Sequence, residues 1–313
     1  MMSELPLDQV RTLLAVVDEG TFDAAANVLR LTPSAVSQRV KALEQRTGRV
    51  LLMRTKPVRP TESGEVVVRF ARQLSRLERD ARTALGMSGP GEPTPLSIAV
   101  NSDSLATWFL PALRRVPQEL DLAYELRRED QDHTAALLRE GLVMAAVTSS
   151  PEAVTGCSVR RLGRMRYLPV AEPAFADRWL GRRAGADVRE LIEDAPVVRF
   201  DRRDDLQDSF VRRLVPGARA SSRRHLVPSS EGFASAVAAG MGWGMVPDVQ
   251  AEPLLREGRL VLLTPDHTVD VPLHWQQWKL DSPALATVAE AVAAEAAETL
   301  AGGRPIAPRP LRG

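Results

Sequence analysis

Three short helices predicted near the N-terminus constrain the fold of this chain more than any other feature of its sequence. Apolar residues at helical spacing predict the first two helices over residues 7–18 and 22–30. The third begins at Thr32-Pro33 and runs to about Thr47, because a side-chain oxygen at the N-cap followed by proline is a strong helix start. Two helices joined by a tight turn, the second one well capped, are typical of a helix-turn-helix.

The third predicted helix has one apolar face and one polar face. Val36, Val40 and Leu43 fall on one side of a helical wheel and are expected to form the buried stripe. The opposite side carries short hydrogen-bonding groups, one amide and one cation, on Ser34, Ser37, Gln38 and Lys41. An amide suits adenine, and a cation suits guanine or phosphate, so this face predicts the reading of DNA bases.

Charge is distributed unevenly along the chain. The 313 residues carry a formal net charge of only +1, yet residues 28–60 hold eight basic side chains and one acid, Glu44. Such a local excess attracts a polyanion such as nucleic acid, although a solvated basic face is the alternative. Residues 50–60 turn from apolar to basic and suit a hairpin wing along phosphates, with an ordinary basic loop as the other interpretation. The predicted DNA-binding residues are Thr32, Ser34, Ser37, Gln38, Arg39, Lys41, Arg54, Lys56 and Arg59.

Thr61 is expected to cap a long helix over residues 62–86. The apolar residues of this helix step by three and four, as they do in the seam of a coiled coil. The predicted dimerisation residues are Val67, Phe70, Leu74, Leu77 and Ala81. A dimer would present two recognition helices to two half-sites of DNA. A helix packed on its own domain is the alternative.

A stretch rich in Gly and Pro follows, and beyond it the pattern changes to alternating strands and helices, which is typical of an α/β sheet with parallel pairs. Strands are expected near 96–100, 120–127, 142–148, 166–171, 196–200, 243–246, 259–263 and 270–275, and helices near 104–115, 132–140, 204–214, 231–239 and 283–300. The predicted organisation is α/β overall, with an all-α winged helix-turn-helix (1–60), a dimerising helix (61–86), a linker (87–95), a two-lobed α/β domain (96–300) and a disordered tail (301–313).

Several function classes are disfavoured by what the sequence lacks. The single cysteine, Cys157, excludes an intrachain disulfide and a cysteine-based zinc site, and the four scattered histidines show no metal spacing. No catalytic Ser/His/Asp order or Gly-rich phosphate loop stands out, so neither an enzyme nor a cofactor is expected. No long apolar run and no secretory signal are present, which predicts a cytoplasmic protein without membrane contact.

One long stretch resembles a known family. Residues 22–44, FDAAANVLRLTPSAVSQRVKALE, followed by Gly48, Leu51, Arg54 and Pro60-Thr-Glu-Ser-Gly64, resemble the LysR-type transcriptional regulators. Further stretches resemble the ArgP/LysG branch of that family, which regulates export of basic amino acids: residues 37–39, 58–61, 99–108, 110–112, 195–201 and 229–233. The resemblance covers about residues 5–300.

This resemblance implies a fold and a function. The family has a winged helix-turn-helix, a dimerising linker helix and a two-lobed effector domain similar to periplasmic binding proteins, assembled as a dimer or as a tetramer made of two dimers. In this branch the effector is a basic amino acid, lysine or arginine, and the target is an amino acid exporter gene. The implied partners are double-stranded DNA, the amino acid, further copies of the chain and RNA polymerase.

The effector site is expected in the loops that follow strands, where open α/β sheets bind ligands. Hydroxyl groups there could bind a carboxylate, and acids could bind the two ammonium or guanidinium groups of a basic amino acid. The candidates are Ser102, Asp103, Ser104, Trp108, Glu129, Asp130, Thr148, Asp201, Asp204, Ser229, Ser230 and Glu231. Several of these residue types also cap helices, and Trp108 is as compatible with a core as with a cleft wall.

Two alternatives to an effector-responsive regulator stay open at this point. One is a nucleoid or replication-origin DNA-binding protein without strong effector control, which would read bent DNA by its shape. The other is an enzyme or transport protein with a two-lobed fold, for which residues 1–86 would have no purpose.

Overall fold

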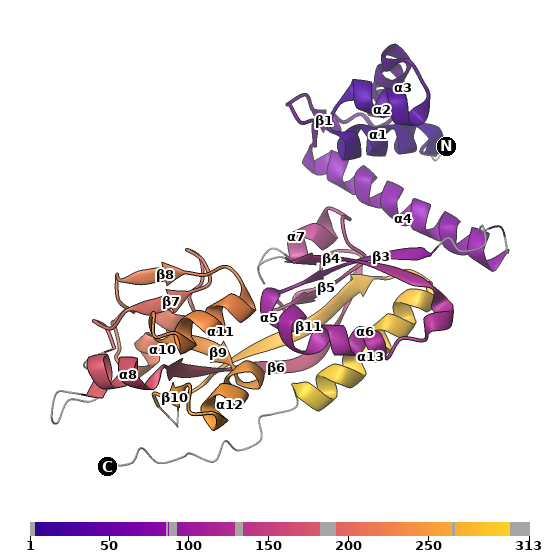
Figure 1. Cartoon of the computed structure of the whole chain (residues 1–313). Coiled ribbons are helices and arrows are strands. Elements are labelled where there is room, and N and C mark those ends of the chain that lie inside the picture. Colours follow the sequence, from indigo (N-terminus) through magenta and orange to yellow (C-terminus); the bar gives the residue numbers. More distant parts are fainter. Residues whose placement is uncertain are drawn as a thin grey trace.

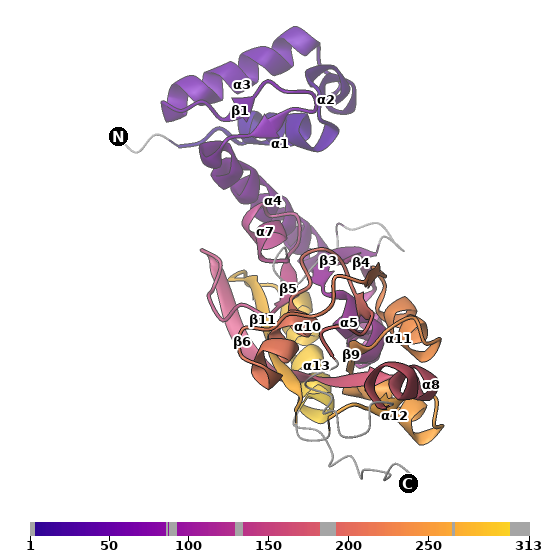
Figure 2. The same cartoon turned by 90° about the vertical axis from the view of Figure 1, so that its left-hand side faces the viewer.

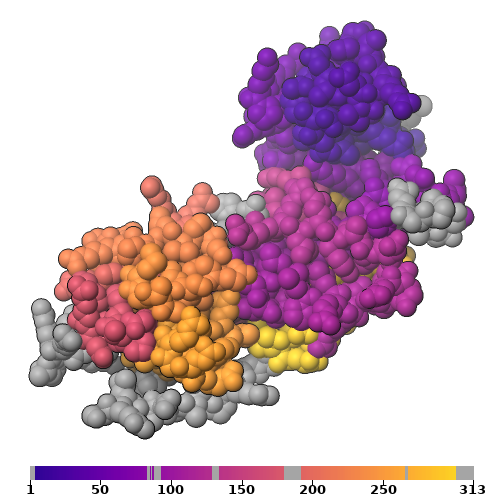
Figure 3. Space-filling model, in the orientation of Figure 1, coloured from indigo at the N-terminus to yellow at the C-terminus, as the bar shows by residue number. Residues whose placement is uncertain are grey.

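The computed structural model of the chain describes residues 4–85, 87, 93–128, 134–181, 192–264 and 267–300 (Figure 1). A small helical unit at the N-terminus is joined by one long helix to a larger α/β unit with two lobes (Figures 1 and 3). Glu129, Asp130, the expected tail and most of the expected linker lie outside the described residues.

The helical unit is built as its sequence predicts. Thr32 Oγ1 accepts a hydrogen bond from the backbone N–H of Ala35 at 3.2 Å, so the predicted cap of the third helix is confirmed. The alanines Ala25 and Ala26 are fully buried, which lets the second helix approach its neighbours closely. The elements of this unit are α1 (Leu7–Glu19), α2 (Phe22–Leu29), α3 (Pro33–Thr47), β1 (Leu52–Met53), β2 (Arg59–Pro60) and α4 (Glu62–Ala84).

The predicted stripe of α3 faces the core of this unit. Val36, Val40 and Leu43 are at most 2% exposed and pack with Val10 and Leu13 of α1. Burial of these side chains is the main force that holds the three helices together. The polar side of α3 is thereby turned outward.

The wing is a short antiparallel hairpin in which Leu52 of β1 pairs with Pro60 of β2. The carboxylate of Glu44, the one acid in the basic stretch, accepts the backbone N–H of Leu51 at 2.8 Å. This bond ties the wing to α3. Helix α4 also approaches the wing closely at Gly64. Only glycine fits there, because a Cβ at this position would lie 1.9 Å from the carbonyl oxygen of Leu51.

Helix α4 divides its apolar residues between two roles. Val67 is 7% exposed and packs in the core of its own unit, which is the alternative that the sequence left open. Phe70 and Leu77, by contrast, are 39% and 42% exposed, and Ala81 is exposed as well. Leu74 is half-buried between them. The outward part of the predicted seam therefore runs from Phe70 toward the C-terminal end of α4.

Two arginines of α4 attach the helical unit to the α/β unit. Arg72 donates one hydrogen bond to Asp18 of α1 and another to the carbonyl oxygen of Glu140, each at 2.6 Å. Arg76 is 4% exposed, forms an ion pair with Asp80 at 2.9 Å and donates to the carbonyl oxygen of Pro95 at 2.8 Å. Charged hydrogen bonds of this kind fix the direction of α4 relative to both units.

The α/β unit consists of two lobes joined by two long strands, β6 (Cys157–Ala171) and β11 (Val269–Trp278) (Figures 1 and 2). The first lobe contains β3 (Thr94–Val100), α5 (Ser102–Ser104), η1 (Leu105–Phe109), α6 (Leu110–Arg114), η2 (Gln118–Leu120), β4 (Leu122–Arg128), α7 (Thr134–Arg139), β5 (Ala145–Thr148) and α13 (Pro283–Thr299). The second lobe contains α8 (Pro173–Ala176), η3 (Asp177–Gly181), β7 (Val197–Arg199), α10 (Leu206–Leu214), β8 (Arg224–Leu226), α11 (Ser230–Ala238), β9 (Gly244–Pro247), α12 (Asp248–Arg256) and β10 (Val261–Leu262).

The main sheet has the order β10-β6-β11-β5-β3-β4, with β9 also paired to β6. Among the described residues, parallel ladders join β3 to β4 and β5 and β7 to β8, and one isolated parallel bridge joins Val197 to Trp243. The prediction of parallel pairs therefore holds only in part, because β6 and β11 run antiparallel to their neighbours as they pass between the lobes.

Other local predictions need correction. The strand expected at 166–171 is only the end of β6, and β8 and α12 were not predicted. Strand β3 begins at Thr94, inside the stretch expected to be linker. Cys157 is buried at the start of β6, and this burial raises the pKa of its thiol to about 11. Within the part of the chain that the structure describes, no helix combines the length and apolar character needed to span a bilayer.

We expect the exposed apolar residues of α4 to hold two copies of the chain together. Replacing both by acids, as F70E/L77E, puts charge where apolar surface would be buried and is expected to weaken the dimer at least tenfold. Sedimentation equilibrium measures this dissociation constant. The variant R79E, which changes an exposed residue of the same helix, is the control. An unchanged dissociation constant in F70E/L77E would show that this face is not an interface between copies.

Candidate DNA-reading face and effector cavity

The outward face of α3 presents the side chains that the sequence singled out for DNA. Thr32, Ser34, Gln38 and Lys41 are exposed, and Ser37 is half-buried. Both views of the molecule place α3 at the end of the helical unit farthest from the α/β unit (Figures 1 and 2). A helix presented in this way can enter the major groove of DNA without obstruction from the rest of the chain.

Arg39 differs from the other predicted DNA-binding residues. It leans toward α1, where its guanidinium lies 3.7 Å from the carboxylate of Asp8 and 3.5 Å from the hydroxyl of Thr12. Arg39 is therefore partly engaged in holding α3 on α1. Thr32 also has a structural role, because its hydroxyl caps α3.

The wing carries the cations that the sequence predicted for phosphates. Arg54, Lys56 and Arg59 are all exposed and lie on or beside the β1–β2 hairpin. Cations beside a recognition helix fix the register of a protein on the duplex through its phosphates, whereas the helix itself distinguishes bases. The two groups of residues therefore suit different parts of one interface.

A cavity of about 240 Å³ lies where the two lobes meet. The first lobe contributes the end of β3 and the start of α5, and the second lobe contributes the loop after β7 and the N-terminal end of α11. Tyr167 of the connecting strand β6 lies between them. The lining residues are Asn101, Ser102, Asp103, Tyr167, Phe200, Asp201, Arg203, Asp204, Asp205, Leu206, Gln207, Ser209, Ser230, Phe233, Met245 and Pro247.

Asp103 is the acid that the first lobe contributes to the cavity. The phenol of Tyr167 donates to its Oδ2 at 2.6 Å, and the hydroxyl of Ser230 in the second lobe donates to it as well. Burial raises the pKa of Asp103 above its ordinary value; these two hydrogen bonds oppose the rise, and the nearby charge of Glu231 adds to it. Asp103 is thus a desolvated carboxylate that a cation entering the cavity would stabilise.

Asn101 lines the same wall of the cavity. Its side chain is 2% exposed, and neither the nitrogen nor the oxygen of its amide has a hydrogen-bond partner among the described residues. Buried amides without partners are costly, so an unpaired amide beside a cavity points to a polar ligand.

The loop after β7 supplies the acids of the second lobe. Asp201 Oδ1 accepts the backbone N–H groups of Arg203 and Asp204 at 2.6 and 3.0 Å. Asp204 in turn accepts the N–H groups of Phe200 and Leu206 at 2.8 and 3.1 Å. The carboxylates therefore hold the loop in one conformation while they line the cavity.

The acids of this loop differ in their electrostatic surroundings. Burial raises the pKa of Asp204, although backbone hydrogen bonds, the side chain of Gln207 and, least, the charge of Arg199 oppose the rise. Partial burial also acts on Asp205, but hydrogen bonds from Arg212 and Ser209 outweigh it and lower the pKa of this group. The lining as a whole contains four carboxylates and one guanidinium, so the cavity favours a cationic ligand.

The cavity contains some of the predicted effector residues and not others. Ser102, Asp103, Asp201, Asp204 and Ser230 line it, as the loops predicted. Ser104 is fully buried and does not line the cavity. Trp108 is 1% exposed in the core of the first lobe, edge-on to Phe109, so it is a core residue and does not wall the cleft.

Three further predicted residues have local structural roles. Thr148 is buried at the end of β5 and accepts the N–H of Ser150. Ser229 caps α11 by accepting the N–H of Gly232 at 3.2 Å, and its hydroxyl also donates to the exposed carboxylate of Glu231 at 3.3 Å. None of these three residues is part of the cavity lining, since Ser229 caps a helix, Thr148 holds the turn after β5 and Glu231 is exposed.

Sequence patterns missed several residues that line the cavity. Tyr167 lies in the middle of a strand, and it reaches the site only because β6 passes from one lobe to the other. Asn101 and Asp205 lie in the predicted loops and could have been chosen by their position. Among the described residues, no group of His, Cys, Asp and Glu has the arrangement of a metal site.

Taken together, an exposed recognition helix and a separate ligand cavity define a ligand-responsive DNA-binding regulator. Residues 7–65 match the bacterial regulatory helix-turn-helix protein, lysR family, and residues 90–297 match the LysR substrate binding domain. The chain belongs to the LysR family of transcriptional regulators. Its relatives are regulators and not enzymes, in agreement with the expectation from the sequence.

Curated relatives and solved structures extend over nearly the whole chain. The lysine export transcriptional regulatory protein LysG of Corynebacterium glutamicum is 43% identical over 93% of this chain and 98% of its own. The crystal structure of ArgP from Mycobacterium tuberculosis is 45% identical, with a TM-score of 0.84 over 92% of this chain and 96% of its own. Full-length LysG from C. glutamicum with bound effector Arg is 42% identical, with a TM-score of 0.79 over 94% and 99% of the two chains.

The geometry of α3 predicts that Gln38 contributes to base recognition. The variant Q38A is expected to weaken binding to the specific site about tenfold or more and to leave binding to random DNA unchanged, because a good amide–base pair contributes about 1–3 kcal/mol. Fluorescence anisotropy with both DNAs measures the ratio. Q118A, which changes an exposed glutamine of the α/β unit, is the control. An equal loss on both DNAs would refute a base-reading role.

The burial of Asp103 predicts that this residue lowers stability at neutral pH. Its pKa is raised in the folded state, so its contribution is favourable below the unfolded value near 3.8 and is lost as the pH rises through the folded value. D103N is therefore expected to raise the free energy of unfolding at pH 8 by on the order of 1 kcal/mol, and by less at pH 5. Urea unfolding at both pH values tests this, with exposed D281N as control. A loss of stability in D103N at pH 8 would contradict it.

Proposed function

We propose that this chain regulates transcription of an amino acid exporter gene in response to lysine or arginine bound between the lobes of its α/β unit. The observation that carries the proposal is the cavity, whose lining combines four carboxylates with hydroxyl and amide donors. A basic amino acid carries two cations and one carboxylate, and this lining offers partners for all three groups.

The two walls of the cavity suit different ends of such a ligand. Asp103, desolvated and beside the hydroxyls of Ser102 and Ser230, matches an α-ammonium group next to an α-carboxylate. The unpaired amide of Asn101 supplies a further donor on the same wall. Asp201 and Asp204 on the opposite wall match the distal ammonium or guanidinium group.

The relatives support the chemical class of this ligand. The C. glutamicum regulator is named for lysine export, and one of its structures is described as holding the effector Arg. A cavity of about 240 Å³ is also smaller than the clefts of 300–1,000 Å³ that hold drug-sized ligands, which suits a free amino acid.

The same proposal assigns a role to the helical unit. Two copies paired through α4 would place two α3 helices on a two-fold DNA site, and a dimer of dimers would extend the contact. Binding of the amino acid changes the populations of lobe arrangements, and the arginine contacts of α4 transmit that change to the DNA-binding unit. The expected partner in transcription is RNA polymerase, and the expected compartment is the cytoplasm.

Calorimetry with L-lysine, L-arginine and L-leucine tests the proposed ligand. At least one basic amino acid is expected to bind, and leucine is not, because it lacks a distal cation. D204N is expected to weaken that binding at least tenfold by removing a charge-assisted contact, whereas the distant surface variant D281N leaves it unchanged. Absence of binding by both basic amino acids would overturn the proposal.

A second measurement tests whether an amino acid bound in the cavity changes DNA binding or transcription. The protein is titrated onto its own upstream intergenic DNA, and transcription from that DNA is followed with and without the bound amino acid. A change in affinity, anisotropy or transcript level is expected, since the family can switch transcription while it stays on DNA. DNA binding with no response to any basic amino acid would instead favour a nucleoid or replication-origin binder.

A further inference from the structure

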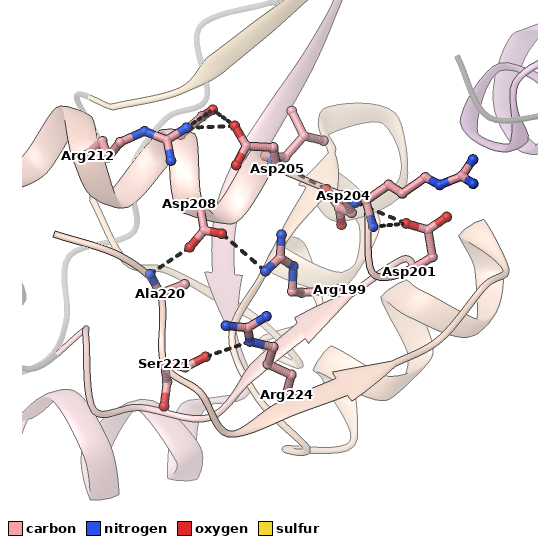
Figure 4. A network of polar contacts seen from close by, with 12 residues as sticks. Arg199, Asp201, Asp204, Asp205, Asp208, Arg212, Ala220, Ser221 and Arg224 are labelled. Carbon is pink, nitrogen blue, oxygen red and sulfur yellow. Dashed lines mark hydrogen bonds and ion pairs between the residues drawn. The ribbon is translucent and has the colours of Figure 1, made fainter. Parts of the chain in front are cut away.

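Arg199, at the end of β7, is a buried cation directly beneath the acidic loop of the cavity. Its side chain is 4% exposed, and its Nη1 lies 3.1 Å from Oδ2 of Asp208 on α10. Figure 4 shows the guanidinium between Asp208 and the loop that carries Asp204. Arg199 itself does not line the cavity.

The ion pair with Asp208 leaves part of the guanidinium available to the loop. Asp208 Oδ1 also accepts the backbone N–H of Ala220 at 2.9 Å, so this carboxylate is shared between two partners. The Nε of Arg199 has no hydrogen-bond partner among the described residues. The positive charge of Arg199 acts to lower the pKa of both Asp204 and Asp205.

The two acids depend on Arg199 to different degrees. Asp205 forms a hydrogen bond with Arg212 at 2.6 Å on its own helix, so it has a cation of its own. Backbone N–H groups and the side chain of Gln207 lower the pKa of Asp204 most, and Arg199 is the cation whose charge adds to this effect. The other charged groups facing this region are Asp201 and Arg203 of the loop, Asp208 of α10, Arg224 of β8 and, across the cavity, Asp103.

We propose that Arg199 is a positioning residue that keeps Asp204 negatively charged, and thereby makes the cavity select a cationic side chain over a neutral one of the same shape. This inference rests on the proposed function, because it concerns how the same cavity distinguishes its ligands. A buried carboxylate without a nearby cation takes up a proton, and a protonated Asp204 attracts a guanidinium no more than a neutral side chain.

A purely structural role for the ion pair makes a different prediction. Buried ion pairs contribute little net stability, and neutral replacement of both partners is commonly tolerated. R199M/D208N is such a replacement, in which the amide can still accept the N–H of Ala220. This variant is expected to fold and yet to lose the discrimination, because the counter-charge of Asp204 is gone.

Calorimetry with L-arginine and L-citrulline, whose ureido group is neutral and of similar shape, measures the discrimination between pH 5.5 and 8.5. R199M and R199M/D208N are expected to bind arginine at least tenfold more weakly at pH 7 and citrulline within about threefold of the natural chain. Their loss of arginine binding at acid pH is expected to begin at a higher pH. R199K and D208N, which keep the cation, are expected to retain the preference, as is the neighbouring control R224M.

The outcomes separate the two proposals. If the natural chain binds arginine and R199M/D208N keeps the full preference over citrulline, the role of Arg199 is refuted and the proposed function stands. Equal losses of both ligands in R199M and D208N would reduce the ion pair to a structural role. The ¹³C titration of the Asp204 carboxyl, assigned with D204N, tests the charge without any ligand. An unchanged titration in R199M/D208N would also refute the inference.

Discussion

Asp103 and Asp204 belong to different lobes, and folding withdraws both carboxylates from water at the place where the lobes meet. Each is hydrogen-bonded, Asp103 by Tyr167 and Ser230 and Asp204 by backbone N–H groups, yet burial raises the pKa of both. Desolvated acids facing one cavity make a cation the natural occupant, because it restores the stabilisation that water gave. Strand β6 contributes Tyr167 to this cavity, the loop after β7 contributes Asp204, and the first turn of α11 contributes Ser230.

The connection between cavity and DNA depends on arginine side chains as well. Arg72 bridges α1 and the C-terminal end of α7, and Arg76 joins α4 to β3, whose end carries Asn101. Helix α4 is therefore attached to the lobe that contributes Asp103, and under the proposed function a rearrangement of that lobe would move the DNA-binding unit with it. Phe70 and Leu77 lie on the outer side of the same helix, where a second copy would make two such units act together.

The sequence predictions were most accurate for elements that are determined by interactions between residues close together in the chain. The cap at Thr32, the buried stripe of Val36, Val40 and Leu43, the wing and the cap of α4 at Thr61 were all predicted, because each depends on residues close together in the chain. The same reasoning identified Ser102, Asp103, Asp201, Asp204 and Ser230 in loops after strands or at the start of a helix. It could not separate these from Ser104, Thr148 and Ser229, because a small hydroxyl residue after a strand can equally cap a helix, hold a turn, be buried or bind a ligand.

The sequence by itself determined the helix-turn-helix, the change to an α/β unit and the set of loops in which an effector site could lie, since periodicity, capping and turn residues act over a few positions. Only the tertiary structure decided which of those loops meet. It brought Tyr167 from the middle of β6 to Asp103, and it placed the buried cation of Arg199 beneath Asp204. The physical reason is that strand order and lobe closure depend on contacts between residues far apart in the chain, and the burial and charge state of a carboxylate follow from those contacts.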